Sequence, residues 1–352
     1  MLQSVQVFNL RNIERLTLQN LQKNNLITGD NGAGKTSILE AIHILVTGKS
    51  FRTSQIARVI QDTAQEVVVS GQLSPDTKLG VARNRKADFR IRINDNNENK
   101  LSNLASYMPI RHITPDSFLM LTTGSKLRRQ YLDFSVFHVK HEFADHWKTY
   151  QRQLKQRNAL LKQSSSYSDL IPWDEQMIVT IEKINRMREN VFAEIITYLQ
   201  ANQLTFLPQY EVQYSLKTGL SSDDLKRAYE DSYIADKRYG YSTLGPHKAD
   251  IDVTIAGHEA HTIISRGELK MLIVSMVLAQ TDWLNDKQIN CCLLIDDLTS
   301  ELDKEKQRQL LNKVLDKAGL QTFISSINIP DYFTKTDKTN VAMFHVEHGR
   351  LL

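Results

Sequence analysis

The first hundred residues alternate between apolar and polar positions, which is the period of a β-strand. Residues 88–94 alternate most regularly, with Arg90 and Arg92 outward and an inward face of Phe89, Ile91 and Ile93. Other segments share this period or form short apolar runs, and we predict strands at 5–10, 16–18, 26–28, 66–70 and 80–83. The first three are predicted to be paired strands.

Near residue 130 the apolar positions change to the spacing of a long amphipathic helix. Its stripe consists of Leu132, Val136, Val139, Phe143, Trp147, Tyr150, Leu154 and Leu161. After the polar loop 164–169, a second stripe follows through Trp173, Met177, Ile181, Ile184, Val191, Ile195 and Tyr198. We predict an antiparallel helical hairpin, a short coiled coil, and a plain helical lobe is equally compatible.

From about residue 240 the α/β pattern returns, with an apolar helix at 271–284 and a strand at 291–295. The predicted fold class is therefore α/β. We expect one domain made of residues 1–115 and 240–352, with a helical lobe, 116–239, inserted between its two parts.

Composition indicates an ordinary globular chain of 352 residues, with 41% hydrophobic and 24% charged residues. No apolar run reaches the roughly 20 residues that cross a bilayer, and the N-terminus lacks a signal-peptide pattern. Cys291 and Cys292 are neighbours on a predicted strand and point to opposite faces, so we expect no disulfide and a cytoplasmic location. The net charge of +4 permits nucleic-acid binding without requiring it.

Between the strand 26–28 and a helix predicted at 37–46 lies a glycine-rich loop that fits G-x-x-x-x-G-K-[ST]. Such a loop presents backbone N–H groups to nucleotide phosphates, its lysine binds the terminal phosphates, and its hydroxyl binds Mg²⁺. The predicted ATP-binding residues are Gly29, Asp30, Asn31, Gly32, Ala33, Gly34, Lys35, Thr36 and Ser37, with Arg11 and Asn12 near the base.

The strand 291–295 ends in two acids, Asp296 and Asp297. An acid at the carboxyl end of a strand beside such a loop completes a Mg²⁺ shell, and a second acid orients or deprotonates the attacking water. We therefore predict that Thr36 and Asp296 bind Mg²⁺, and that Lys35, Asp296 and Asp297 are catalytic.

Two later motifs resemble those of ABC-type ATPases. Ser265, Arg266, Gly267 and Glu268 open a helix as the signature motif of that family does, and Ser300 to Asp303 resemble its D-loop. The resemblance implies that the Ser265 segment acts in trans on the nucleotide of a second copy, and that dimerisation depends on ATP.

The long insert between Thr36 and Ser265 argues against transporter ATPases, and its short helices resemble those of the RecF family of ABC/SMC-like repair ATPases. Matching stretches include Lys49 to Arg52, Thr123 to Arg129, Leu244 to Asp250 and Leu294 to Asp297. The resemblance implies an ATP-bound homodimer that binds duplex and gapped DNA, acts with RecR and RecO, and helps load recombinase onto gaps.

The sequence departs from the ABC pattern at several positions. Asp297 stands where most relatives carry Glu, so we expect slow, DNA-dependent hydrolysis. Arg266 replaces a glycine, and Ser325 and Ser326 stand where many relatives have a switch histidine. No Q-loop glutamine can be assigned.

Basic residues provide candidate DNA contacts at Arg90, Arg92, Lys126, Arg128 and Arg129. A basic side of the first long helix adds Lys148, Arg152, Lys155, Arg157 and Lys162. A solvated surface explains these charges equally well. The sequence shows no evident aromatic platform for single-stranded bases, which favours backbone contacts to duplex.

Three alternatives remain open. The first is an ABC-type subunit with another partner, for example a transporter ATPase. The second is a GTPase, because residues 334–337 mimic the guanine-specifying T-K-x-D motif. The third is an ATP-gated scaffold that does not hydrolyse.

Overall fold

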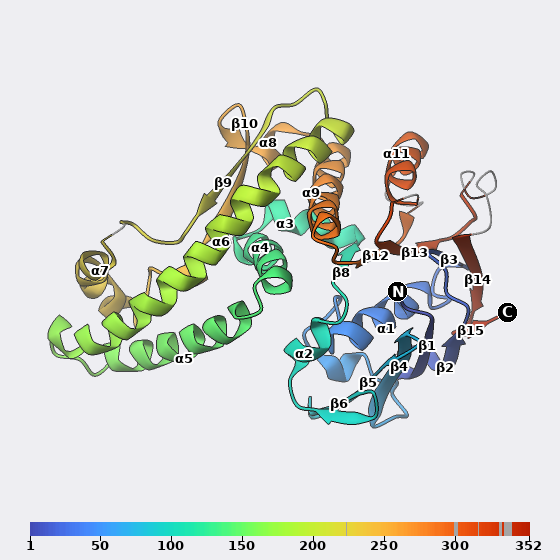
Figure 1. Ribbon diagram of the computed structural model, residues 1–352, viewed down its shortest axis with the longest axis horizontal. Coiled ribbons are helices and arrows are strands. Elements are labelled where there is room, and N and C mark those ends of the chain that lie inside the picture. Colours follow the sequence, from blue (N-terminus) through green and yellow to red (C-terminus); the bar gives the residue numbers. More distant parts are fainter. Residues whose placement is uncertain (223, 299–301, 316, 331–332, 334–339) are drawn as a thin grey trace. The chain divides into compact units, whose positions relative to one another are not determined.

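The computed structural model describes residues 1–222, 224–298, 302–315, 317–330, 333 and 340–352. The chain divides into two compact units (Figure 1), the head (1–117 and 281–352) and the lobe (118–280). In the prediction from sequence, the second part of the head begins at residue 240 instead. The boundary differs because β10 (Asp250–Ile255) pairs with β9 (Val212–Lys217), so this segment belongs to the sheet of the lobe.

The first sheet of the head is antiparallel and has the strand order β2-β1-β4-β5-β6-β7. Its strands are β1 (Ser4–Leu10), β2 (Ile13–Leu18), β4 (Glu66–Ser74), β5 (Thr77–Asn84), β6 (Phe89–Ile93) and β7 (Asn96–Glu98). The predicted inward face of β6 is correct at Ile91, which is buried. It is wrong at Phe89, which is 38% exposed because it lies at the end of its strand.

The second sheet of the head is mainly parallel and has the order β15-β14-β3-β13-β12-β8. Its strands are β3 (Asn24–Thr28), β8 (Ile110–Ile113), β12 (Cys291–Ile295), β13 (Leu320–Ser326), β14 (Val341–Glu347) and β15 (Arg350–Leu351). The expected pairing of the first three strands therefore fails at β3. All five residues of β3 are buried, as is typical of a central parallel strand covered on both faces.

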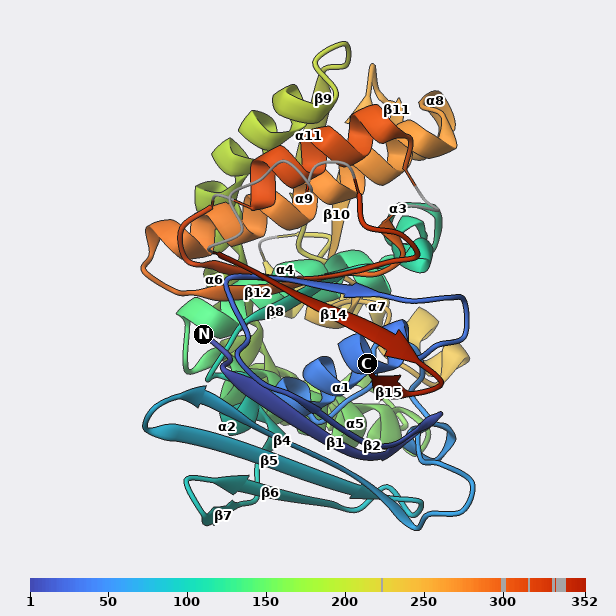
Figure 2. The same cartoon turned by 90° about the vertical axis from the view of Figure 1, so that its right-hand side faces the viewer.

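Helix α1 (Lys35–Thr47) lies between the two sheets of the head (Figure 2). Its apolar side chains join one core with residues of β1, β4 and β5 on one side and with Leu294 and Phe323 on the other. Among the described residues of the head, the other helices are η1 (Ile56–Arg58), α2 (Leu101–Ala105) and α11 (Lys304–Val314), and η2 (Pro115–Phe118) crosses the boundary to the lobe. Burial on both sides fixes the direction in which the N-terminus of α1 points.

The lobe consists of helices around a three-stranded antiparallel sheet of β9, β10 and β11 (His258–Glu259). Its helices are α3 (Leu119–Thr122), α4 (Lys126–Val139), α5 (Phe143–Leu161), η3 (Tyr167–Asp169), α6 (Ile171–Phe206), α7 (Leu225–Tyr239), η4 (Pro246–Lys248) and α8 (Ala260–Ile263). Helix α9 (Arg266–Asp286) contains the boundary between the units.

The helical hairpin is present as α5 and α6, which pack along each other on either side of η3 (Figure 1). Its first arm is shorter than predicted because the stripe from Leu132 to Leu161 is not one helix. The chain becomes extended at Lys140, where φ is −112° and ψ is 92°, and this separates α4 from α5. The apolar spacing continues across the turn and therefore conceals the break.

A buried ionic network joins three helices of the lobe. Arg157 of α5 donates hydrogen bonds to Asp174 of α6 (2.7 Å), to Asp236 of α7 (2.6 Å) and to the Ser242 hydroxyl (2.7 Å). The Arg157 side chain is only 1% exposed, so it is not part of a solvated basic face as the sequence suggested. Burial raises the pKa of Asp174 even with the guanidinium beside it.

Replacing this arginine tests the network. We predict that Arg157→Ala lowers the free energy of unfolding by about 3 to 5 kcal/mol, because two buried carboxylates lose their counter-charge. Arg227→Ala is the matched control, because Arg227 pairs with Asp231 at 3.9 Å while both side chains are exposed. The measurement is urea unfolding followed by circular dichroism, and equal midpoints for the two variants would contradict the prediction.

Candidate functional site

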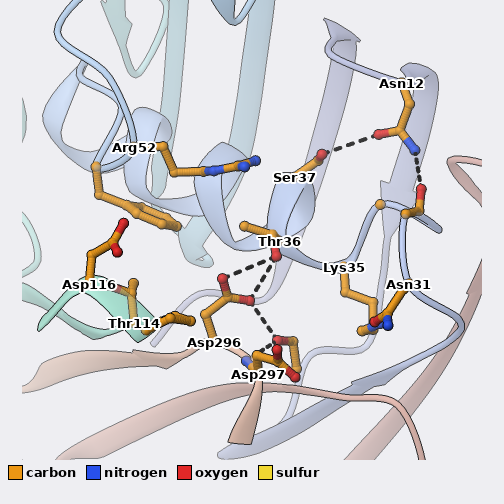
Figure 3. A pocket seen from close by; sticks show the side chains of 15 residues that line it. Asn12, Asn31, Lys35, Thr36, Ser37, Arg52, Thr114, Asp116, Asp296 and Asp297 are labelled. Carbon is orange, nitrogen blue, oxygen red and sulfur yellow. Dashed lines mark hydrogen bonds between the residues drawn. The ribbon is translucent and has the colours of Figure 1, made fainter. Parts of the chain in front are cut away.

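The carboxyl ends of four parallel strands, β3, β8, β12 and β13, meet at one edge of the sheet of the head. A cavity of about 540 Å³ opens there, lined by the loop before α1, by residues that follow β8 and β12, and by Ser325 within β13 (Figure 3). Ligands of open α/β sheets bind at this edge. The fold therefore places the predicted phosphate loop and the two predicted acids in one cavity.

The loop between β3 and α1 is held closed by its own lysine. The Lys35 ammonium donates to the carbonyl oxygens of Gly29 (2.6 Å) and Asp30 (2.9 Å), and burial lowers the pKa of Lys35. Because α1 begins at Lys35, its first backbone N–H groups face the cavity, which forms an anion site at a helix N-terminus.

Thr36 and Asp296 face each other across the floor of the cavity. The Thr36 hydroxyl donates to both carboxylate oxygens of Asp296 (2.9 and 3.1 Å), and the Ser325 hydroxyl donates to Asp296 Oδ1 (2.7 Å). Burial raises the pKa of Asp296, which the hydrogen bonds from Ser325 and Thr36 oppose. The backbone N–H of Asp297 donates to Ser325 Oγ (2.8 Å), so one serine connects the two acids.

These groups fit a magnesium ion. Mg²⁺ prefers hard oxygen ligands and usually takes one or two from the protein, with the rest from water and phosphate. Thr36 Oγ1 and the Asp296 carboxylate are such ligands, and they lie within hydrogen-bond distance of each other. A cation between them would also offset the cost of burying the Asp296 charge.

Comparison with known proteins agrees with this geometry. The model of the RecF/RecN/SMC N-terminal domain matches residues 1–351. The chain is 36% identical over 349 residues to the "DNA replication and repair protein RecF" of Proteus mirabilis (strain HI4320), covering 97% of this chain and 96% of the relative. It is 37% identical over 349 residues to the RecF of Vibrio parahaemolyticus (serotype O3:K6, strain RIMD 2210633), with the same coverage.

The chain belongs to the RecF family. Solved structures show the same fold: the "recombination mediator protein RecF-ATP in RecFOR pathway" has a TM-score of 0.88 at 22% identity and covers 100% of this chain and 96% of its own. An Smc head bound to the C-winged helix domain of ScpA has a TM-score of 0.60 at 12% identity, covering 99% of this chain and 95% of its own. The predicted α/β class with an ABC/SMC-like head is thus confirmed.

Two predicted ATP-binding residues, Arg11 and Asn12, lie outside the phosphate loop, between β1 and β2. Asn12 lies at the cavity, where it donates to Gly32 O (3.1 Å) and accepts from Ser37 Oγ (3.1 Å). Arg11 is instead paired with the fully buried Glu40 through a bidentate contact, so its guanidinium does not line the cavity. Arg11 is therefore placed as a structural partner of α1.

Sequence reasoning missed several residues at this site. Phe51, Arg52, Thr114 and Asp116 line the cavity, and Glu40 accepts a hydrogen bond from Ser50 in the segment that carries Arg52. Glu40 could have been recognised from the sequence, because it is an acid within the apolar face of the helix predicted at 37–46. Thr114 and Asp116 follow β8, which has no motif of its own. No glutamine is among the described residues that line the cavity, so the Q-loop stays unassigned.

The signature segment forms the start of α9. Ser265 Oγ accepts from the backbone N–H of Glu268 (3.3 Å), and Glu268 accepts from the N–H of Ser265 (2.9 Å), which is a capping box. Arg266 is exposed, and its guanidinium lies 5.1 Å from the centre of the Phe118 ring. Ser265 is also exposed, at the N-terminus of a long helix. This segment therefore caps α9 and leaves the Ser265 and Arg266 side chains exposed.

The D-loop and switch predictions have different outcomes. Ser300 lies outside the described residues, as do residues 334–337 of the GTPase alternative. Asp303 caps α11 by accepting from the N–H of Lys306 (2.9 Å). Ser325 contacts both acids of the cavity, whereas Ser326 donates to Asn328 O (2.6 Å).

Three of the five candidate DNA contacts are used within the chain. Arg90 pairs with Glu66 (2.7 Å), Arg128 pairs with Asp250 (2.8 Å), and Arg129 donates to Ala249 O (2.7 Å). Arg92 and Lys126 are exposed. In the part of the chain that the structure describes, no helix is both long enough and apolar enough to cross a membrane.

The loop geometry gives a test with a matched pair of glycines. Gly29 has φ of +150°, and a methyl group there would overlap the carbonyl oxygen of Val346. Gly32 has φ of +81°, and a methyl group there would meet nothing within 4 Å. We predict that Gly29→Ala lowers the free energy of unfolding by about 3 kcal/mol. Gly32→Ala should cost only about 1 kcal/mol, from its left-handed backbone. Urea unfolding measures both free energies. Equal losses in the two variants would show that the overlap with Val346 does not determine the cost of Gly29→Ala.

Proposed function

We propose that this chain is an ATP-dependent DNA-binding protein of recombination and repair, and a slow ATPase. The observation that carries the proposal is the hydrogen bond between Thr36 and Asp296 beside the phosphate loop that Lys35 closes. It places a candidate cation site next to a candidate phosphate site. The printed names of the relatives, which concern DNA replication and repair, support the DNA part. The printed title of a solved relative, which names ATP, supports the nucleotide.

In this proposal each side chain has a separate task. Lys35 and the N-terminus of α1 bind the terminal phosphates, and Thr36 and Asp296 hold Mg²⁺. When bound, the ion neutralises charge on phosphate oxygens. Asp297 orients or deprotonates the attacking water. A shorter carboxylate than Glu lies farther from that water, so we expect slow turnover.

The proposal extends to assembly. Ser265 and Gly267, with the exposed N-terminus of α9, bind the nucleotide of a second copy, so ATP joins two chains. The dimer binds duplex and gapped DNA and, together with RecR and RecO, helps load recombinase onto gaps. These partners come from the family resemblance, and the exposed α9 N-terminus supports the contact in trans.

The test of this function is ATP turnover by the full chain with gapped duplex, with intact duplex and without DNA. We expect gapped duplex to stimulate turnover most, and DNA affinity to fall as salt rises because phosphate contacts release counterions. Turnover that ignores DNA would overturn the DNA-binding role.

Ser265→Arg separates binding from assembly. We predict normal ATP binding but no ATP-dependent dimer and at least tenfold slower hydrolysis, because a bulky cation replaces the hydroxyl at the helix N-terminus. Sedimentation with and without ATP measures the dimer, and the neighbouring exposed Thr262→Arg is the control. A Ser265→Arg dimer would disprove the contact in trans.

Ser325→Ala tests the polar link between the acids. We predict about tenfold slower turnover with nucleotide affinity little changed, since a hydrogen bond to a charged group contributes about 1.5 to 3 kcal/mol. The lost donor also raises the pKa of Asp296, so the acidic limb of the pH–rate profile should move to higher pH. Ser326→Ala is the matched control because its hydroxyl contacts Asn328 instead. Equal turnover rates for both variants would show that the Ser325 hydroxyl does not contribute to hydrolysis.

A further inference from the structure

Two exposed tyrosines stack on each other where α7 ends. The rings of Tyr239 and Tyr241 lie 5.7 Å apart at an interplanar angle of 26°, and the residues are 58% and 46% exposed. Gly240 between them caps α7 in the left-handed conformation, with φ of 74°, and so brings the two neighbours to one side. An aromatic platform was not evident from the sequence, because only the fold stacks these two rings on each other.

The turn that carries the tyrosines is fixed on both sides. Before it, Asp236 accepts from Arg157 (2.6 Å) and from the backbone N–H of Thr243 (2.8 Å). After it, the N–H of Ser242 donates to Asn158 (2.9 Å). The buried ionic network of the lobe therefore fixes the backbone turn that carries the two tyrosines, and the rings are packed on each other. Side chains that are already ordered lose little entropy when a ligand stacks on them.

One lysine contacts this pair, and two more line a cavity beside Gly240. The Lys248 ammonium lies 5.3 Å from the centre of the Tyr241 ring, and its backbone is held because Arg188 and Arg129 donate to the carbonyls of Pro246 and Ala249. Beside Gly240 is a cavity of about 510 Å³ whose lining includes Lys155 and Lys162. The three lysines are exposed and have no ion pair within the described part of the chain.

We propose that Tyr239 and Tyr241, with Lys155, Lys162 and Lys248, form a binding site for single-stranded nucleic acid. Every base has a face that stacks on an aromatic ring, and lysines contact the adjacent phosphates. A protein segment would also cover tyrosines, but unpaired lysines beside them favour a polyanion. The proposal rests on the DNA-binding function proposed above and assigns the single-stranded side of a gap to the lobe.

The test is fluorescence anisotropy of a labelled oligodeoxythymidine titrated with the full chain at several salt concentrations. We expect the double variant Tyr239→Ala/Tyr241→Ala to bind about tenfold more weakly at every salt concentration, because stacked bases are lost. The double Phe variant keeps the rings and should bind within about twofold of the original chain. Tyr107→Ala is the control, since Tyr107 is 44% exposed and lies in the head.

The lysines give a second readout. Lys155→Ala/Lys162→Ala should reduce the slope of log K against log salt by about 0.7 for each lysine, the value for single strands. An original chain that does not bind the oligonucleotide, or a double Ala variant that binds it as tightly as the original, would overturn the proposal and leave the pair as a protein contact. Gapped-duplex stimulation of ATP turnover, measured on the same samples, tests the underlying function separately.

Discussion

The parallel pairing of β13 with both β3 and β12 is the constraint on which the site in the head depends, and it brings Thr36 to Asp296. The two residues are 260 positions apart, and they meet because β3 and β12 both flank β13 in one parallel sheet. Parallel strands bring their carboxyl ends to the same edge, so the phosphate loop after β3 and the acid after β12 must lie close together. The chain can therefore leave the head, form the lobe and return without disturbing the site.

Burial explains why a few polar groups can make this cavity a strong site for a charged ligand. Desolvation disfavours the charged forms of both Lys35 and Asp296, and their pKa values shift in opposite directions accordingly. Each group recovers part of this cost locally, Lys35 from two backbone carbonyls and Asp296 from two hydroxyls. A nucleotide phosphate and a cation would satisfy the same groups more completely. The site is therefore complementary to a ligand that carries both negative phosphates and a bound cation.

Local patterns with a single physical cause could be predicted from the sequence. The loop from Gly29 to Thr36, the strand ending at Asp296 and the long helix α6 all follow from glycine placement or apolar period. The predictions that failed for Arg11 and for β3 concerned residues whose contacts are made with distant parts of the chain. Glu40 and Arg11 form their ion pair only after α1 packs beside β1. Strand β3 does not pair with β1 or β2 because β13 and β14 pair with its two edges. The break at Lys140 was hidden because the apolar spacing happens to span it.

The basic residues show the same dependence most clearly. Counting charges along a helix treats Arg157 and Lys155 alike, yet one is buried in an ionic network and the other faces solvent. The planar guanidinium suits burial because its fixed fork of donors can satisfy several acceptors at once, while an ammonium is more strongly hydrated. Arg157, Arg188 and Arg129 accordingly hold carboxylates or backbone carbonyls in place, whereas Lys155, Lys162 and Lys248 are exposed and have no ion pair among the described residues. The buried charges thus determine where the exposed ones stand, which links the stability of the lobe to the surface it presents.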